Sequence, residues 1–141
     1  MSQRRSSVGA GLPLFASLDY VYVPAVDVDA TVRAYVEDLG AQLVWKVRGM
    51  GTTVACVRVS ADGPPVLLAG HLPGTVPILV HRVDSYEATV ATLRAAGVEL
   101  TELEIPHGPC ASFTAKGGQR YAIYELVRPD AATHFDGRID P

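Results

Sequence analysis

The 141-residue sequence has little of what marks several large classes of protein. It has two cysteines, one tryptophan, and only two lysines among its twelve basic residues. The net charge of −3 gives no electrostatic signal for nucleic acid, and no run of Lys and Arg indicates a membrane surface. No apolar stretch approaches the ~20 residues that cross a bilayer. We therefore expect neither nucleic acid nor a membrane as a partner, and a cytoplasmic protein in which Cys56 and Cys110 are reduced core residues.

The composition is that of one folded domain with short ends. Hydrophobic residues make up 48% of the chain and charged residues 19%, so the chain can fill a core of its own. Residues 1–16 contain two arginines and a weak apolar stretch broken by Gly and Pro, which favours a flexible leader over a secretory signal. Residues 130–141 are expected to form a polar tail, which leaves residues 17–129 for the domain.

A repeat dominates the rest of the sequence. The stretch VDVDATVRAYVEDLG (26–40) begins and ends as VDSYEATVATLRAAG (83–97) does, with the first Asp of one and the Asp of the other 57 positions apart. Asp27 and Asp84 are placed to cap a helix, and the closing Gly of each stretch can end it in the left-handed conformation. Ungapped agreement of this length predicts an internal structural duplication.

Each copy is expected to form a strand, a helix and three further strands. The helices are predicted over 28–39 and 85–96, where apolar residues recur at helical spacing, and the turns where Gly and Pro cluster. The result is an α+β fold of two tandem βαβββ modules, about 17–70 and 76–127. The strands are predicted over 18–23, 41–47, 52–60, 64–70, 76–83, 98–105, 109–115 and 120–127.

This order of elements resembles the vicinal oxygen chelate superfamily. The resemblance is carried by LDYVYVPAVDVDATVRAYVEDLGAQLV, by ILVHRVDSYEATVATLRAAGVEL, and by PHGPCASFTAKGGQRYAIYELVRP, which is similar to the terminal hairpin of that group. The superfamily includes glyoxalase I, extradiol dioxygenases, methylmalonyl-CoA epimerase, fosfomycin resistance enzymes, and the bleomycin and mitomycin resistance binding proteins. The resemblance implies one cupped mixed sheet with the helices outside and a ligand cavity between two half-cups.

The resemblance also implies where a metal would be held. Enzymes of the superfamily bind a divalent ion through His, Glu or Gln from the first and last strand of each module. In this sequence those positions correspond to Tyr20, Leu68, Pro77 and Glu125, of which one is a good ligand. Because a divalent cation needs several oxygen or nitrogen donors, we expect no metal and no other cofactor.

Strand alternation predicts which side chains line the cavity. Successive side chains point to opposite faces, so Tyr20 and Tyr22 face the cavity when Val21 and Val23 pack against the helix. The 57-residue offset gives His81 the same orientation in the second copy. Aromatic rings suit flat ligands, and a carboxylate can bind a cationic group. The predicted ligand-binding residues are Tyr20, Tyr22, Trp45, His81, Tyr121 and Glu125.

These residues favour a binding protein over a metalloenzyme. The leading prediction is a metal-independent protein that sequesters a small hydrophobic, aromatic or polycyclic molecule such as an antibiotic, similar to the non-metal binding members of the superfamily. A homodimer is expected, because members of this length usually pair and the strand edges are apolar.

Three other interpretations stay open. In a metal-free lyase, isomerase or cyclase, Glu125 and His81 would be catalytic as an acid–base pair, unless Glu125 only pairs with Arg82 or Arg120. An accessory domain with a vestigial pocket is the second. The third is a glyoxalase- or dioxygenase-like enzyme with a displaced metal site, formed by His71, His81, His107 and Glu125.

Overall fold

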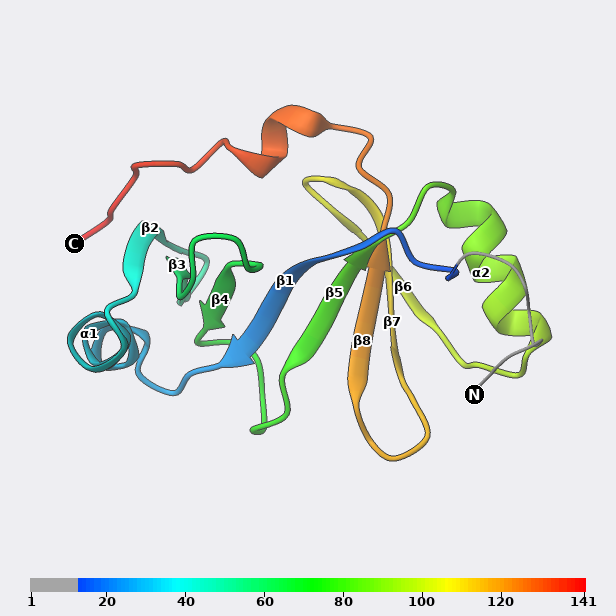
Figure 1. Ribbon diagram of the computed structural model, residues 1–141, viewed down its shortest axis with the longest axis horizontal. Helices are drawn as coiled ribbons and strands as arrows, with labels where there is room; N and C mark the ends of the chain where they lie inside the picture. The colour runs from blue at the N-terminus through cyan, green and yellow to red at the C-terminus, as the bar shows by residue number, and fades with distance from the viewer. Residues whose placement is uncertain (1–12) are drawn as a thin grey trace.

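A single curled sheet forms the centre of the computed structural model, which describes residues 13–141 (Figure 1). Its eight strands have the order β2-β3-β4-β1-β5-β8-β7-β6. Of the predicted leader, residues 1–12 lie outside the described residues. The strands are β1 (Ser17–Pro24), β2 (Gln42–Gly49), β3 (Thr52–Arg58), β4 (Val66–Ala69), β5 (Ile78–Arg82), β6 (Thr101–Ile105), β7 (Gly108–Thr114) and β8 (Arg120–Tyr124).

Two modules of the same topology share this sheet. Strands β1–β4 with α1 (Val28–Leu39) form the first, and β5–β8 with α2 (Tyr86–Ala95) form the second. In each module the first strand is parallel to the last, and β1 joins β5 in antiparallel register. Figure 1 shows the helices at opposite ends of the sheet. The predicted α+β fold of two tandem βαβββ modules is confirmed.

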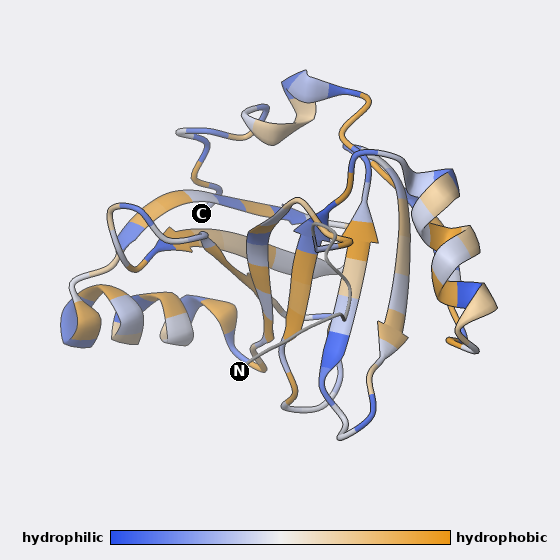
Figure 2. Cartoon of the chain, turned by 45° about the vertical axis from the view of Figure 1, so that its right-hand side comes forward, coloured by the Kyte–Doolittle hydropathy of each residue, from blue (hydrophilic) through white to orange (hydrophobic). Residues whose placement is uncertain are grey.

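Helix α1 has the bounds and the cap that its sequence predicts. The Asp27 carboxylate accepts a hydrogen bond from the Ala30 N–H at 3.0 Å, and Gly40 ends the helix with a φ of +68°. Val28 and Val32 are buried against residues of β3 and β4. Figure 2 shows apolar bands on both helices and along the central strands. No helix within residues 13–141 is long and apolar enough to cross a membrane.

Helix α2 begins one residue later than the repeat predicts. Ser85, not Asp84, is the cap, and its Oγ accepts a backbone N–H at 3.2 Å. The two caps, Asp27 and Ser85, are therefore 58 positions apart (27 to 85). Leu68 and Ile123 are both fully buried opposite a fully buried alanine, and they are 55 positions apart (68 to 123). The modules thus differ by small insertions and deletions, which an ungapped offset cannot represent.

The cap assignment gives a matched pair of variants. We expect Ser85→Ala to lower the free energy of unfolding by about 1 kcal/mol, because a backbone N–H at the start of α2 loses its partner. Asp84→Ala should change it by less than about 0.5 kcal/mol. Urea denaturation measures both free energies of unfolding. A larger loss for Asp84→Ala than for Ser85→Ala would show that Asp84 is the cap, as the repeat predicts.

The C-terminal segment lies along the outer edge of the first module. After β8 the chain forms a short 3-10 helix (η2, Pro129–Ala132) and returns to β2 (Figure 1). Three backbone hydrogen bonds of 2.8–3.1 Å join residues 137–140 to Val44 and Lys46, and Ile139 forms a parallel bridge with Lys46. The end of the predicted polar tail therefore pairs with the edge of β2.

Candidate functional site

The two faces of the sheet are covered differently. One face packs against the helices, and its buried clusters include Val32 of α1 and Val90 of α2. The other, called here the helix-free face, has a cluster made of strand and loop residues. Tyr20 and Tyr22 belong to it, whereas Val23 packs on the α1 side, so β1 alternates as predicted. The helix-free cluster consists of Tyr20, Tyr22, Leu72, Ile78, Val80, Ile105, Cys110, Ala122, Tyr124 and Leu126.

Two pairs of hydrogen-bonded polar groups lie on the helix-free face. The Tyr20 hydroxyl is 3.3 Å from His107 Nε2, and the Tyr124 hydroxyl donates to the Asp19 carboxylate. Arg82 Nε lies 3.7 Å from the same carboxylate. The rings of His107 and Tyr124 are 5.5 Å apart, so the two pairs form one group. The register of β1 against β5 shifts between Leu18 and Tyr20, and a bulge of this kind turns the side chain of Asp19, which lies between them.

Further aromatic groups extend this face into the first module. The Tyr22 hydroxyl is 3.2 Å from His71 Nε2, and His71 Nδ1 is 3.3 Å from Thr52 Oγ1. Trp45 is opposite Cys56 in the β2–β3 pair. Both residues are on the helix-free face, because the β3 neighbours of Cys56 pack toward α1.

Burial keeps the hydroxyls of Tyr20, Tyr22 and Tyr124 and the imidazole of His107 uncharged. Desolvation, followed by the nearby Asp19 charge, raises the pKa of Tyr20, and desolvation raises the pKa of Tyr22. Desolvation and then the hydrogen bond to Asp19 raise the pKa of Tyr124. Burial lowers the pKa of His107, so its imidazole is neutral at pH 7. The site therefore offers aromatic surface with neutral hydroxyl and imidazole groups beside the Asp19 carboxylate.

The two thiols are buried and free, as predicted. Burial raises the pKa of Cys56 to about 11 and that of Cys110 to about 11. Since a thiolate is the nucleophilic form, both thiols are unreactive near neutral pH. They contribute apolar surface to the helix-free face.

His81 and Tyr121 lie on the α2 side, not on the face predicted for them. The His81 ring is 5.1 Å from Phe15 and 5.7 Å from Tyr121, which stacks on Phe113 at 5.5 Å. For His81 the physical reason is the offset of 58 instead of 57 at the start of the second module. A slip of one residue turns every side chain of a strand to the other face. Val80 has the orientation expected for His81 and joins the helix-free cluster.

Glu125 also points toward α2. Its Oε1 accepts a hydrogen bond at 2.8 Å from the N–H of Tyr86, the first residue of α2, where the positive end of the helix dipole favours a carboxylate. No hydrogen bond joins Glu125 to His81 within residues 13–141, and the alternative ion pairs with arginine are not formed there either. The side chain that reaches the helix-free face from this part of the chain is Tyr124, one residue earlier.

The donors on the helix-free face do not fit a divalent metal ion. The first and last strands present tyrosine hydroxyls, apolar side chains and the paired Asp19 and Arg82 there, and burial holds the phenols neutral. The side chains of the displaced site do not converge: His71 and His107 contact separate tyrosines, and His81 and Glu125 lie on the α2 side. Within the described residues, no group of three or more His, Cys, Asp or Glu side chains is arranged to hold a metal.

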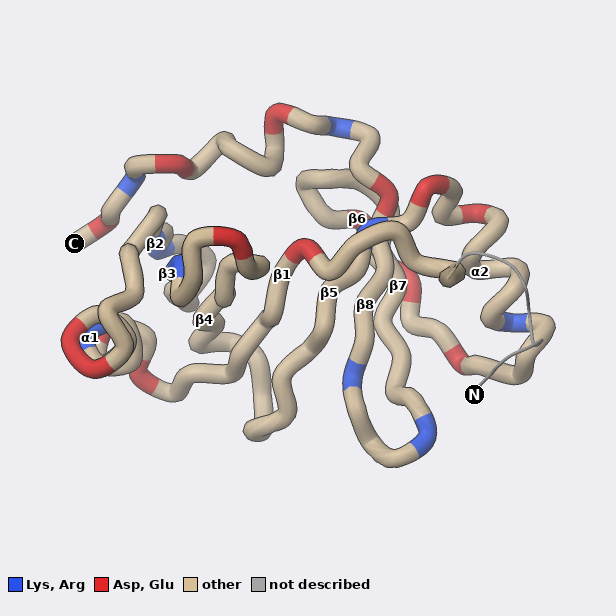
Figure 3. Tube along the Cα trace, in the orientation of Figure 1, with Lys and Arg blue, Asp and Glu red and all other residues tan. Residues whose placement is uncertain are grey.

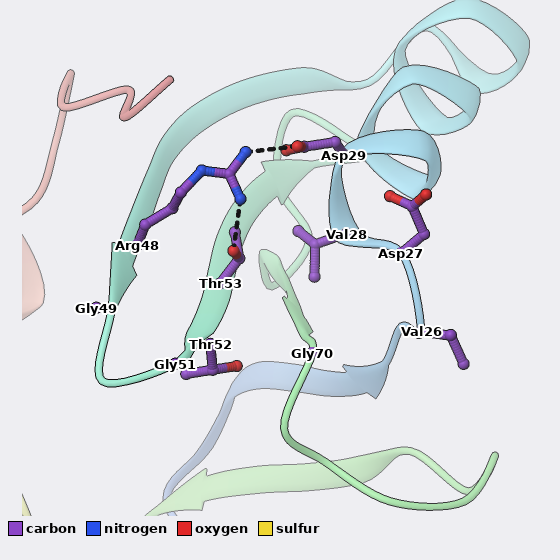
Figure 4. A pocket seen from close by; sticks show the side chains of 10 residues that line it. All are labelled: Val26, Asp27, Val28, Asp29, Arg48, Gly49, Gly51, Thr52, Thr53 and Gly70. Atoms are coloured by element: carbon purple, nitrogen blue, oxygen red, sulfur yellow. Dashed lines mark hydrogen bonds and ion pairs between the residues drawn. The ribbon is translucent and has the colours of Figure 1, made fainter.

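Two surface hollows lie apart from the helix-free cluster. One of about 700 Å³ lies between the start of α1 and the β2–β3 turn, and Figure 4 shows Arg48 reaching across it. The Arg48 guanidinium pairs with Asp29 and donates to Thr53 at 2.8 Å. Hydrogen bonds from Lys46 and Arg48 lower the pKa of the exposed Asp29 carboxylate. The second, of about 850 Å³, lies at the end of α2 and is lined by residues 96–101 and by the β7–β8 hairpin.

Solved structures share this arrangement of modules. No protein-family model matches the sequence, and no curated protein matches it. The methylmalonyl-CoA epimerase of Mycobacterium tuberculosis superposes with a TM-score of 0.67 at 23% identity, over 86% of this chain and 95% of that chain. A catechol 2,3-dioxygenase superposes with a TM-score of 0.60 at 16% identity, over 81% of this chain and 42% of that chain. The chain has the vicinal oxygen chelate fold.

The fold that the sequence resemblance implies is therefore confirmed. A further neighbour, a methylmalonyl-CoA epimerase solved in complex with methylmalonyl-CoA and NH4+, has a TM-score of 0.61 at 16% identity, over 81% of this chain and 96% of that chain. At these identities the likeness is one of fold, and the side chains of this chain decide what its site can do.

Sequence reasoning did not find Asp19 or Tyr124 as site residues, and it found His107 only as a candidate ligand of a displaced metal site. The sequence does contain a signal for Tyr124. It is three positions after Tyr121 in β8, so the two side chains lie on opposite faces of the strand, and both faces are buried. The contact of His107 with Tyr20 joins residues 87 positions apart, which no local pattern encodes.

Proposed function

We propose that the helix-free face binds a small, largely apolar molecule with an aromatic or polycyclic ring system, without a metal, and sequesters it. The observation that carries this proposal is the gathering of Tyr20, Tyr22, Tyr124 and Trp45 on one face of the sheet. Such rings provide apolar area for a flat ligand, and their O–H and N–H groups supply directional hydrogen bonds. An antibiotic is one ligand with this chemistry.

The chemistry of the face supports binding over metal-assisted catalysis. Divalent cations are held by several converging carboxylate, imidazole or carbonyl groups, whereas on the helix-free face His107, His71 and Asp19 each bond a different tyrosine. Of the six ligand-binding residues predicted from the sequence, we retain Tyr20, Tyr22 and Trp45. His81, Tyr121 and Glu125 are left out of the proposed site because they contact the α2 side.

Identical substitutions on the two faces test the proposal. A panel of acridine and anthraquinone compounds is titrated against the protein, with quenching of its single tryptophan, Trp45, as the signal. We expect Tyr20→Leu to weaken binding about tenfold, since one aromatic contact contributes on the order of 1 kcal/mol beyond area burial. Tyr121→Leu, on the other face, should leave the Kd unchanged. Equal effects of both variants, or no binding by the wild-type protein, would contradict the proposed site.

A metal-free acid–base enzyme is the second candidate, and the pair of Tyr20 and His107 favours it. A neutral imidazole can accept a proton near pH 7, and here it lies 3.3 Å from a hydroxyl that can relay one. Mass spectrometry of each bound compound after incubation distinguishes the candidates. A chemically changed product that disappears in His107→Gln indicates an enzyme, and unchanged compound indicates sequestration.

The proposed assembly is a homodimer and the proposed location the cytoplasm, as expected from the sequence. Sedimentation equilibrium at micromolar concentration should give a mass near twice that of the 15.0 kDa chain. A single 15.0 kDa species under these conditions would exclude the dimer.

A further inference from the structure

The C-terminal tail reaches the same face as the proposed ligand. It leaves β8 in the second module and pairs with β2 in the first, so it spans both halves of the sheet (Figure 1). Its Phe135 ring lies 5.3 Å from the ring of Trp45, at an interplanar angle of 55°. An aromatic side chain of the tail therefore packs on an aromatic side chain of the helix-free face.

A tight turn fixes the part of the tail that follows Phe135. The Arg138 N–H donates to the Phe135 carbonyl at 2.9 Å, which closes a four-residue turn. Gly137, the third residue of this turn, has a φ of +82°, a conformation that glycine adopts readily. The Arg138 guanidinium lies 5.6 Å from the centre of the Phe135 ring and pairs with Asp140 at 3.0 Å. Asp136 is thereby held in the turn next to Phe135.

Asp136 supplies a negative charge close to the aromatic residues. Burial is the main cause of the raised pKa values of Tyr20 and Cys56 on the helix-free face, and the Asp136 charge makes a smaller contribution to both. Within residues 13–141 its carboxylate forms no ion pair, unlike the Asp19 carboxylate, which has Arg82 beside it. Charged residues are few along β1, β5 and β8 and gather at loops, helices and the tail (Figure 3). Asp136 therefore places a negative charge, without an ion-pair partner among the described residues, next to the Phe135 ring that packs on Trp45.

We infer that the tail completes the binding site, with Phe135 as a second wall beside Trp45 and Asp136 as the acceptor for a positive charge, so that the ligand is a flat aromatic cation. This inference rests on the proposed function and specifies its ligand class. Trp45 and Phe135 contact each other, so a flat ring lying against them gains contact with two aromatic side chains, and a protonated amine near Asp136 gains a charge-assisted hydrogen bond. An aromatic anion gains the same aromatic contacts, but the Asp136 carboxylate repels it.

Two dyes of opposite charge separate these contributions. Proflavine is a planar aromatic cation and 1-anilinonaphthalene-8-sulfonate an aromatic anion, and both are titrated against the full chain by Trp45 quenching. Asp136→Asn should raise the Kd for proflavine about tenfold at low salt, with a smaller effect at high salt, and should leave the Kd for the anion unchanged or lower. Phe135→Leu should weaken both dyes. The matched control is Asp130→Asn, an exposed acid in η2, which should change neither.

The failures of the two proposals are distinguishable. If the wild type binds both dyes and Tyr20→Leu weakens them, but Asp136→Asn and Phe135→Leu bind as the wild type does, the helix-free face is the site and the tail is not part of it. If the wild type binds neither dye, the proposed function fails and the inference fails with it. If a variant has the same thermal midpoint as the wild type, its weaker binding is not caused by unfolding.

Discussion

Replacing Gly108 with alanine is expected to lower the free energy of unfolding by about 2–4 kcal/mol. Gly108 is the first residue of β7 and has a φ of +154°, a conformation that side chains disfavour. A Cβ at this position would lie 2.2 Å from the carbonyl oxygen of Glu125 and 3.0 Å from a methyl carbon of Val127. Because the nearest atom belongs to the backbone, the end of β8 must move to relieve the clash.

The matched control for this substitution is Gly49→Ala. Gly49 lies outside the left-handed region of φ, and a Cβ there would meet nothing within 4 Å, so we expect a change of less than about 1 kcal/mol. Urea denaturation measures both variants. His107 precedes Gly108, and its carbonyl accepts from the Val127 N–H at 3.0 Å, so Gly108→Ala should also disturb the contact with Tyr20. Equal free energies of unfolding for Gly108→Ala and Gly49→Ala would show that the end of β8 can move without a loss of stability.

Leu68→Ala is expected to cost about 2–5 kcal/mol, because it leaves a cavity beneath α1. Leu68 is fully buried, and Ile123, which has the same place in the second module, is fully buried beneath α2. Ile123→Ala should cost a similar amount. Leu39→Ala, at a position 57% exposed, should cost less than about 1 kcal/mol. A small loss for Leu68→Ala beside a large one for Ile123→Ala would mean that the modules do not contribute equally to the core.

The elements of this fold are local in the sequence, and for that reason they could be predicted. Helix α1 begins and ends where its capping Asp27 and its closing Gly40 place it, and the turns follow Gly and Pro. The first strand also alternates as expected, since Tyr20 and Tyr22 both face away from α1. In each case the evidence lies within a few residues of the feature.

The orientation of the second module depends on register, and there the prediction failed. The repeat is visible at an offset of 57, but a single extra residue before Ser85 is enough to move His81 from one face to the other. The parity of β8 likewise gives the helix-free face to Tyr124 and not to Glu125. Contacts such as Tyr20 with His107 and Trp45 with Phe135 join distant segments, so they follow only from the three-dimensional structure.

The pairing of the tail with β2 affects which sheet edges can pair with a strand of a second copy. With that edge occupied, β6 is the one outer strand edge left open within the described residues. Glu102 and Glu104 of β6 are paired with Arg94 and Arg128, so this edge carries charged groups, which disfavour the addition of another strand. The tail on β2 and the charged groups on β6 both disfavour edge-to-edge pairing of two copies. We therefore expect a second copy to approach through the faces of the molecule.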